Sequence, residues 1–217
     1  MSGQYDVVSF SILLGALSLI PFIVVTTTSF LKFSLVLLVL RNALGVQQVP
    51  PTMAIYGVAL ALSAFVMAPT LQEVGKRALE IEPTHRSRST PMLEQARHAF
   101  DPLRDFMLKY SRPEQREAFL VSAKKLWPKD VADNAKSSDT LVLIPAFVVS
   151  ELQTGYEIAF LIYIPFVVID LLISNLLMAL GMQQVSPQTI TTPLKLLLFS
   201  LVDGWAKLLN ALAMSYV

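Results

Sequence analysis

Charged side chains are distributed very unevenly along this chain of 217 residues. Three lie in residues 1–72, twenty-four in residues 73–139 and six in residues 140–217. Only 15% of the chain is charged, against about 25% in soluble domains, and 54% is hydrophobic. The pattern predicts N-terminal hydrophobic helices (1–72), a polar helical domain (73–139) and C-terminal hydrophobic helical hairpins (140–217). It argues against a soluble globular enzyme and favours a membrane protein with one inserted polar domain.

The N-terminal block contains two apolar segments. Between Asp6 and Lys32 lie 25 uncharged residues, and a membrane-spanning helix needs about 20. The residues before this run contain no Lys or Arg, so we expect a retained helix and not a cleaved signal peptide. Pro21 predicts a kink, with the threonines at 26–28 available to satisfy freed backbone groups. A second segment runs from 53 to 71, and its helical periodicity continues to Ala78.

The polar block has the apolar spacing of helices and no strand alternation, which predicts an all-α fold. Thr90 and Pro91 predict a helix start, and a second helix is expected from Pro113 until Pro128 stops it. Residues 82–90 are predicted to form a loop. The first helix is expected to turn one apolar face inward, made of Leu93, Ala96, Phe100, Leu103, Met107 and Tyr110.

The C-terminal block is apolar but carries isolated charges and four prolines, which predict repeated breaks in its helices. A charge near the centre of a membrane helix costs roughly 2.5–3.5 kcal/mol. Charges in these segments should therefore face protein or water, so we expect an assembly or a channel. The residues expected to pair between helices or subunits are Asp170, Lys195, Asp203 and Lys207.

Sites for chemistry are scarce. Glu94 and His98 have a spacing that can hold zinc, but no Cys and no further nearby His complete a ligand set. Asp170 and Asp203 could form an aspartyl-protease pair, yet Asp203 lies in the sequence VDGW, which favours an ion pair with Lys207 one helical turn away. We expect no catalytic residue, metal or cofactor. The net charge of +1 gives no general attraction to nucleic acid.

The segment from 176 to 193 contains Gly181 and two prolines in apolar surroundings. Irregular backbone at membrane depth is tolerated where it is buried in protein or lines a cavity. A loop that projects into a pore, with Met182, Gln183 and Gln184 at its tip, and an ordinary turn between two helices explain this pattern equally well.

Four segments of the chain resemble the FliP/SctR family of type III export-apparatus proteins: TSFLKFSLVLLVLRNALGVQQVPP (28–51), PAFVVSEL (145–152), IPFVVIDLLISNLLMALGM (164–182) and PLKLLLFSLVDGW (193–205). The likeness extends from about residue 7 to residue 217 and is weakest over 80–125. The N-terminal residues and LWPKD (126–130) are more similar to the injectisome branch than to flagellar members.

The resemblance implies a non-enzymatic core subunit of the export gate. Five copies would assemble with the S and T subunits into a closed helical ring in the basal body, through which unfolded proteins are exported. Hydropathy indicates about four spans, and the location implied is the bacterial inner membrane, with the polar domain on the periplasmic side.

The family also has a methionine-rich loop that forms a gasket around the pore. Many members have Gly-Met-Met-Met where this chain has Gly181, Met182, Gln183 and Gln184. Methionine is flexible and apolar, which suits a seal around varied side chains. The resemblance thus implies that residues 182–184 form a constriction, with Phe199 beside it.

Three other functions fit parts of the pattern. A flagellar export-gate subunit would belong to the same family. A secondary transporter would use charges and broken helices near the membrane midplane, but it predicts inverted repeats, and the two hydrophobic blocks differ in the order and content of their motifs. A structural membrane scaffold would have no conducting path.

Overall fold

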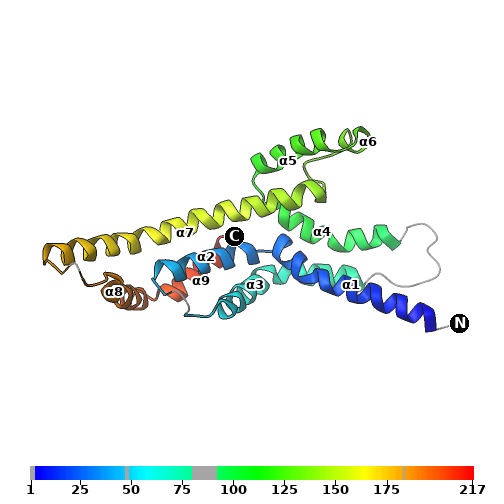
Figure 1. Ribbon diagram of the computed structural model, residues 1–217. Helices are drawn as coiled ribbons and strands as arrows, with labels where there is room; N and C mark the ends of the chain where they lie inside the picture. Colours follow the sequence, from blue (N-terminus) through cyan, green and yellow to red (C-terminus); the bar gives the residue numbers. More distant parts are fainter. Residues whose placement is uncertain (1–2, 47–48, 80–91, 183) are drawn as a thin grey trace. The chain divides into compact units, whose positions relative to one another are not determined.

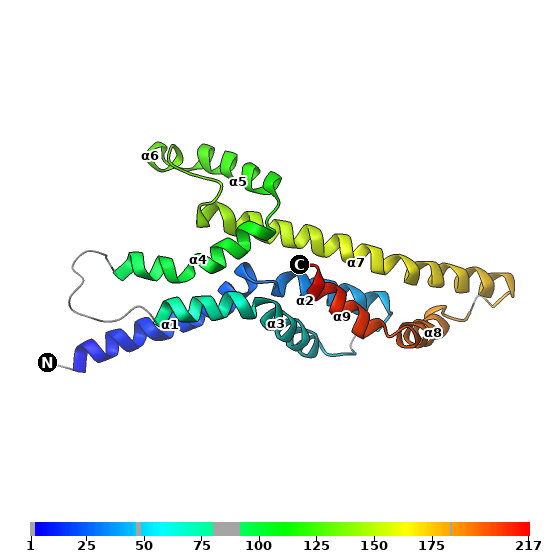
Figure 2. The ribbon, with the colours of Figure 1, turned by 180° about the vertical axis from the view of Figure 1, so that it is seen from behind.

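The computed structural model describes residues 3–46, 49–79, 92–182 and 184–217 (Figures 1 and 2). Every regular element in these ranges is a helix, which confirms the all-α prediction. Along the chain they are α1 (Gly3–Thr27), α2 (Phe30–Ala43), α3 (Thr52–Leu79), α4 (Met92–Tyr110), α5 (Pro113–Leu126), α6 (Lys129–Ala132), α7 (Thr140–Ala179), α8 (Gln188–Leu201) and α9 (Gly204–Met214).

Threonines, and not Pro21, mark the end of the first helix. Helix α1 runs through Pro21 and ends at Thr27. The hydroxyls of Thr26, Thr27 and Thr28 donate hydrogen bonds to carbonyl oxygens four residues earlier, at 2.9, 2.8 and 2.5 Å. The last four carbonyls of a helix have no N–H partner within it, and the Thr28 hydroxyl satisfies one of these in α1, that of Val24.

The prediction that prolines break the C-terminal helices repeatedly is wrong for α7. It is continuous for 40 residues, through both Pro145 and Pro165. Helix α8 likewise contains Pro193. A proline removes one backbone hydrogen bond, whereas an apolar surrounding makes every other exposed backbone group costly, so the helix persists on either side. At about 1.5 Å per residue α7 is roughly 60 Å long, about twice the hydrocarbon thickness of a bilayer.

Two described helices, α3 and α7, are long and apolar enough to cross a membrane. The number rises to four if α1 with α2, and α8 with α9, each count as one bent span, as hydropathy predicts. Helix α3 also extends to Leu79, past the apolar limit, which confirms the periodicity inferred from the sequence.

The chain forms two compact units. Unit 1 contains Met1–Thr28 and Thr70–Val148. In its core Phe106 of α4 packs against Tyr110 and against Phe147 of α7, with ring centroids 4.7 and 6.0 Å apart. The predicted inward face of α4 is correct at Met107 but wrong at Phe100, which is exposed because Ala99 and Phe106 occupy the buried side. Helix α5 begins at Pro113 as predicted and ends just before Trp127 and Pro128.

Unit 2 contains Ser29–Pro69 and Val149–Val217, and α2 forms its centre. Half of the side chains of α2 are buried, so neighbouring segments cover a wide face of this helix. Near its start Ser29 donates a hydrogen bond to Ser63 of α3 at 3.0 Å, and both hydroxyls are buried. Helices α7 and α8, and the segment after α9, also contact α2 through the polar groups described below. The division by hydropathy into 1–72, 73–139 and 140–217 stays a prediction.

Candidate functional site

A buried polar cluster in unit 2 joins α2, α7 and the segment after α9. The ammonium of Lys32 (α2) lies 3.7 Å from Glu151 Oε1 (α7), and each side chain is only 2% exposed. The hydroxyl of Tyr216, just beyond α9, donates a hydrogen bond to Glu151 Oε2. The Lys32 ammonium also lies 3.4 Å from the centre of the Tyr216 ring. One carboxylate and one aromatic ring together therefore compensate a single buried cation.

The packing around this cluster leaves little free space. The ring of Phe33 meets that of Tyr216 edge to face, with centroids 5.6 Å apart. A Cβ atom at Gly155, one turn beyond Glu151 on α7, would lie 3.2 Å from Leu35 Cδ2 and 3.6 Å from Lys32 Cγ. A glycine at this position lets α7 approach α2 closely enough for the two charges to meet.

A second polar contact lies near the opposite end of α2. The ammonium of Lys195 (α8) is buried and lies 2.5 Å from Asp170 Oδ2 (α7). It also donates a hydrogen bond to the carbonyl oxygen of Ala43 at 3.0 Å. A cation at the C-terminus of α2 is favourable because the last carbonyls lack helical partners and carry partial negative charge. Asp170 is 43% exposed, so water screens part of this ion pair.

Asp203 and Lys207 are placed differently. Both side chains are exposed, and among the described residues the structure contains no ion pair between them. Asp203 adopts the left-handed conformation (φ 52°, ψ 41°) and lies at the break between α8 and α9, where the helices bend by 65°. Gly204 follows, and a Cβ atom there would overlap the ring of Phe199.

Phe199 belongs to an aromatic cluster at this bend. Its ring centroid lies 5.4 Å from that of Trp205 and 6.1 Å from that of Phe166. The side chain is partly buried. Its contacts therefore hold the α8–α9 bend, and its proposed place beside the constriction stays a prediction.

The loop from 180 to 187 is shaped by Gly181. Its φ of +71° ends α7. The Gly181 N–H donates to the carbonyl of Met178 at 3.1 Å, and the Met182 N–H donates to that of Leu177 at 2.9 Å. These two bonds define a Schellman motif, which terminates the helix and turns the chain away.

Met182 thus begins a short exposed loop. Its side chain is 45% exposed, and Gln184 is also exposed. Gln183 lies outside the described residues. The adjoining end of α7 presents exposed large apolar side chains, namely Leu172, Leu176, Met178 and Leu180. The loop and the end of α7 thus form an apolar surface that the described part of this chain leaves uncovered.

Other candidate chemistry receives no support from the geometry. His98 contacts the Asp101 carboxylate at 3.0 Å on the exposed surface of α4, and the side chain of Glu94 lies outside the described residues. No group of three His, Asp or Glu side chains among the described residues is placed to hold a metal ion. The sequence pattern alone marks Lys32 and Glu151 as charges that interrupt apolar segments, and it did not predict that they pair. Their opposite charges and isolation in such segments are the signal that could have paired them.

The chain matches the FliP family over residues 13–212. It is 51% identical to the harpin secretion protein HrpW of Pseudomonas syringae pv. syringae, over 95% of this chain and 99% of that protein. It is 47% identical to the harpin secretion protein HrcR of Erwinia amylovora (99% and 98% covered) and 46% identical to the Yop proteins translocation protein R of Yersinia pestis (97% of each).

These relatives are secretion and translocation proteins by name, and their likeness covers the polar segment as well as the apolar ones. Together with the long apolar helices they indicate an inner-membrane protein that assembles with other secretion components. The chain belongs to the FliP family, on its injectisome branch, and is a structural protein of the type III secretion apparatus and not an enzyme.

Proposed function

We propose that this protein is a core subunit of the export gate, in which several copies enclose a closed channel for unfolded proteins. The observation that carries this proposal is the loop after α7. Gly181 ends the helix and leaves Met182 about half exposed next to an uncovered apolar surface. Such a surface is costly in water and calls for other protein chains or lipid.

In the proposed gate, residues 182–184 of each copy form the constriction. A ring of Met182 side chains narrows the channel because methionine adapts its shape to its neighbours. The glutamines add hydrogen-bonding groups that can pair around the ring. The narrow loop then holds back ions while an extended polypeptide passes.

The internal charges support an assembly. Lys32 and Glu151 neutralise each other within the chain, as do Lys195 and Asp170. Asp203 and Lys207 remain exposed, so their contribution to the gate is to pair with neighbouring copies. A homopentamer with the S and T subunits, and a periplasmic polar domain, complete the proposal.

Native mass spectrometry of the detergent-extracted protein tests the assembly. The protein is expressed alone and then together with candidate S and T subunits. The proposal expects a homo-oligomer, five copies in the full form, that gains the smaller partners. A monomer or dimer in both preparations would contradict it and would favour a transporter that works as a small unit.

A further inference from the structure

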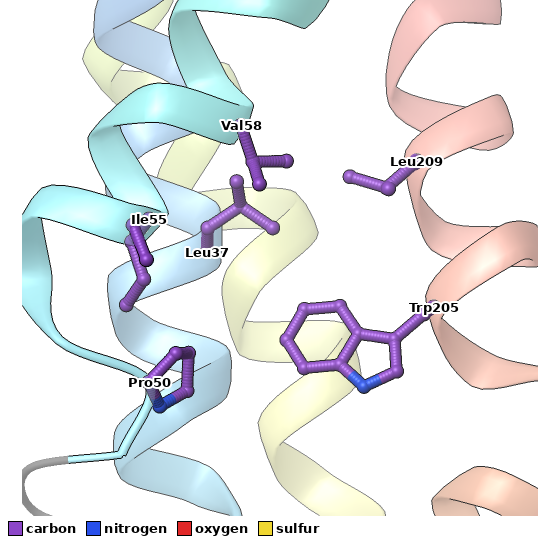
Figure 3. A pocket seen from close by; sticks show the side chains of 7 residues that line it. Leu37, Pro50, Ile55, Val58, Trp205 and Leu209 are labelled. Atoms are coloured by element: carbon purple, nitrogen blue, oxygen red, sulfur yellow. The ribbon is translucent and has the colours of Figure 1, made fainter.

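A cavity of about 280 Å³ opens between α2, α3 and α9 within unit 2 (Figure 3). Leu37 and Ile55 form its buried floor, whereas Val58 and Trp205 stand at its rim and are 42% and 41% exposed. Figure 3 shows the six-membered ring of Trp205 directed toward Leu37. Only apolar groups line the cavity, so water gains few hydrogen bonds there and a hydrocarbon is the favoured occupant.

A cation lies beside one end of this cavity. Arg41 follows Leu37 by one turn of α2, which puts both residues on the same face of the helix. Its Nη1 donates a hydrogen bond of 3.0 Å to the hydroxyl of Thr52, and Thr52 lies between Pro50 and Ala54, two residues that line the cavity. The guanidinium therefore marks the Pro50 end of the cavity.

The residues that the structure describes leave one donor of the Arg41 guanidinium without an acceptor. Its Nε is buried and has no acceptor among the residues that the structure describes. A buried donor without an acceptor is unfavourable, and a guanidinium pairs best with a planar or tetrahedral oxyanion. The N-terminus of α3, which starts at Thr52, adds partial positive charge at the same place.

We propose that this site binds one anionic phospholipid, with an acyl chain in the cavity and the phosphate against Arg41. An apolar slot ending at a cation matches a molecule with a hydrocarbon chain and an anionic head. The size of the cavity favours a single chain over a helix of a protein partner, since a helix is about 10 Å or more across. Helix α3 is long and apolar enough to cross a membrane, and α2 and α9 each belong to a bent pair that passes the same test, so lipids are at hand if these helices lie in the membrane. It is independent of the role proposed for residues 182–184.

Trp205 offers a direct probe because the chain contains only two tryptophans. In full-length protein carrying Trp127→Phe, Trp205 is the sole tryptophan fluorophore. The detergent-solubilised protein is titrated with phosphatidylglycerol whose acyl chains are dibrominated, and separately with phosphatidylcholine carrying the same chains. Bromine quenches tryptophan only at short range, so saturable quenching reports an acyl chain beside the indole.

We expect phosphatidylglycerol to quench Trp205 at concentrations about five- to tenfold lower than phosphatidylcholine does, reflecting one guanidinium–phosphate contact. Arg41→Gln should make the two lipids equal. Ala54→Phe, which fills the cavity, should abolish saturable quenching. Leu60→Phe, an exposed position of α3 that does not line the cavity, serves as the matched control and should leave quenching unchanged.

Two results would overturn the proposal. If both lipids quench wild-type Trp205 equally, or if Arg41→Gln leaves the preference unchanged, the phosphate does not bind Arg41. If neither lipid quenches saturably while co-expressed S or T subunits alter the Trp205 emission, a protein segment occupies the cavity instead.

Discussion

The hydroxyl of Tyr216 donates a hydrogen bond to the buried carboxylate of Glu151, 65 positions earlier in the chain. The same tyrosine places its ring against the ammonium of Lys32. Tyr216 thus attaches the segment after α9 to the centre of unit 2. It also contacts both partners of the buried ion pair. Removing a partner from such a cluster leaves polar atoms without compensation, which makes the cluster a sensitive point for stability.

Tyr216→Phe should lower the free energy of unfolding by about 1–3 kcal/mol, because one buried carboxylate oxygen loses its donor while the ring stays in place. Tyr216→Ala should cost more, since it also removes the contacts with Lys32 and Phe33. Denaturant unfolding in detergent measures both. An unchanged free energy of unfolding for Tyr216→Phe would contradict the role of the hydroxyl–carboxylate bond, and equal losses for the two variants would contradict the role of the ring.

Glu151→Gln should lower the free energy of unfolding by about 3–5 kcal/mol, more than Tyr216→Phe does, because it leaves the Lys32 ammonium buried without a counter-charge. The double variant Lys32→Met/Glu151→Gln removes the buried cation as well and should recover part of the loss. The free energies of unfolding of Lys32→Met, Glu151→Gln and the double variant together give the coupling free energy between the two side chains. Strictly additive losses would show that the two charges do not interact.

Asp170→Asn and Asp203→Asn should separate folding from assembly. Asp170 pairs with buried Lys195, so its substitution should lower the melting temperature of the isolated protein. Asp203 is exposed and forms no ion pair in the described part of the chain, so its substitution should leave that temperature nearly unchanged and reduce recovery of the oligomer. A stable and stoichiometric complex that carries Asp203→Asn would contradict the inter-subunit role of Asp203.

Gly204→Ala should disturb the α8–α9 bend, since a Cβ atom at this position overlaps the ring of Phe199. Moving that ring breaks its contacts with Phe166 and Trp205, and overpacking of this kind costs about 1–3 kcal/mol. The combination with Phe199→Leu should restore stability by making room. Circular dichroism during thermal unfolding can follow all three proteins, and no rescue by Phe199→Leu would show that the clash is not the cause.

Local sequence signals anticipated the described helices better than they anticipated the contacts between them. Pro113 and Pro128 flank α5 closely, and the periodicity beyond Leu71 correctly extended α3. Prolines 145 and 165 misled because the cost of interrupting a helix in apolar surroundings depends on context that a sequence pattern does not contain. The ordered motifs nevertheless identified the family.

The polar contacts of unit 2 were harder to foresee. Lys32 and Glu151 lie on different helices, which pack closely at Gly155. Similarly, the Lys195 ammonium reaches the Ala43 carbonyl, a backbone acceptor that no residue pattern marks. Gly181 was a clear signal for a turn, and its positive φ agrees with that prediction.

The most direct test of the proposed gate is small-ion leak across the membrane of cells that assemble the apparatus with Met182→Ala. Met178→Ala, an exposed methionine one turn earlier on α7, is the matched control. The account predicts raised leak for Met182→Ala with the complex still assembled, and leak at the wild-type level for Met178→Ala. Unchanged leak and unchanged secretion with Met182→Ala would show that Met182 does not form the seal.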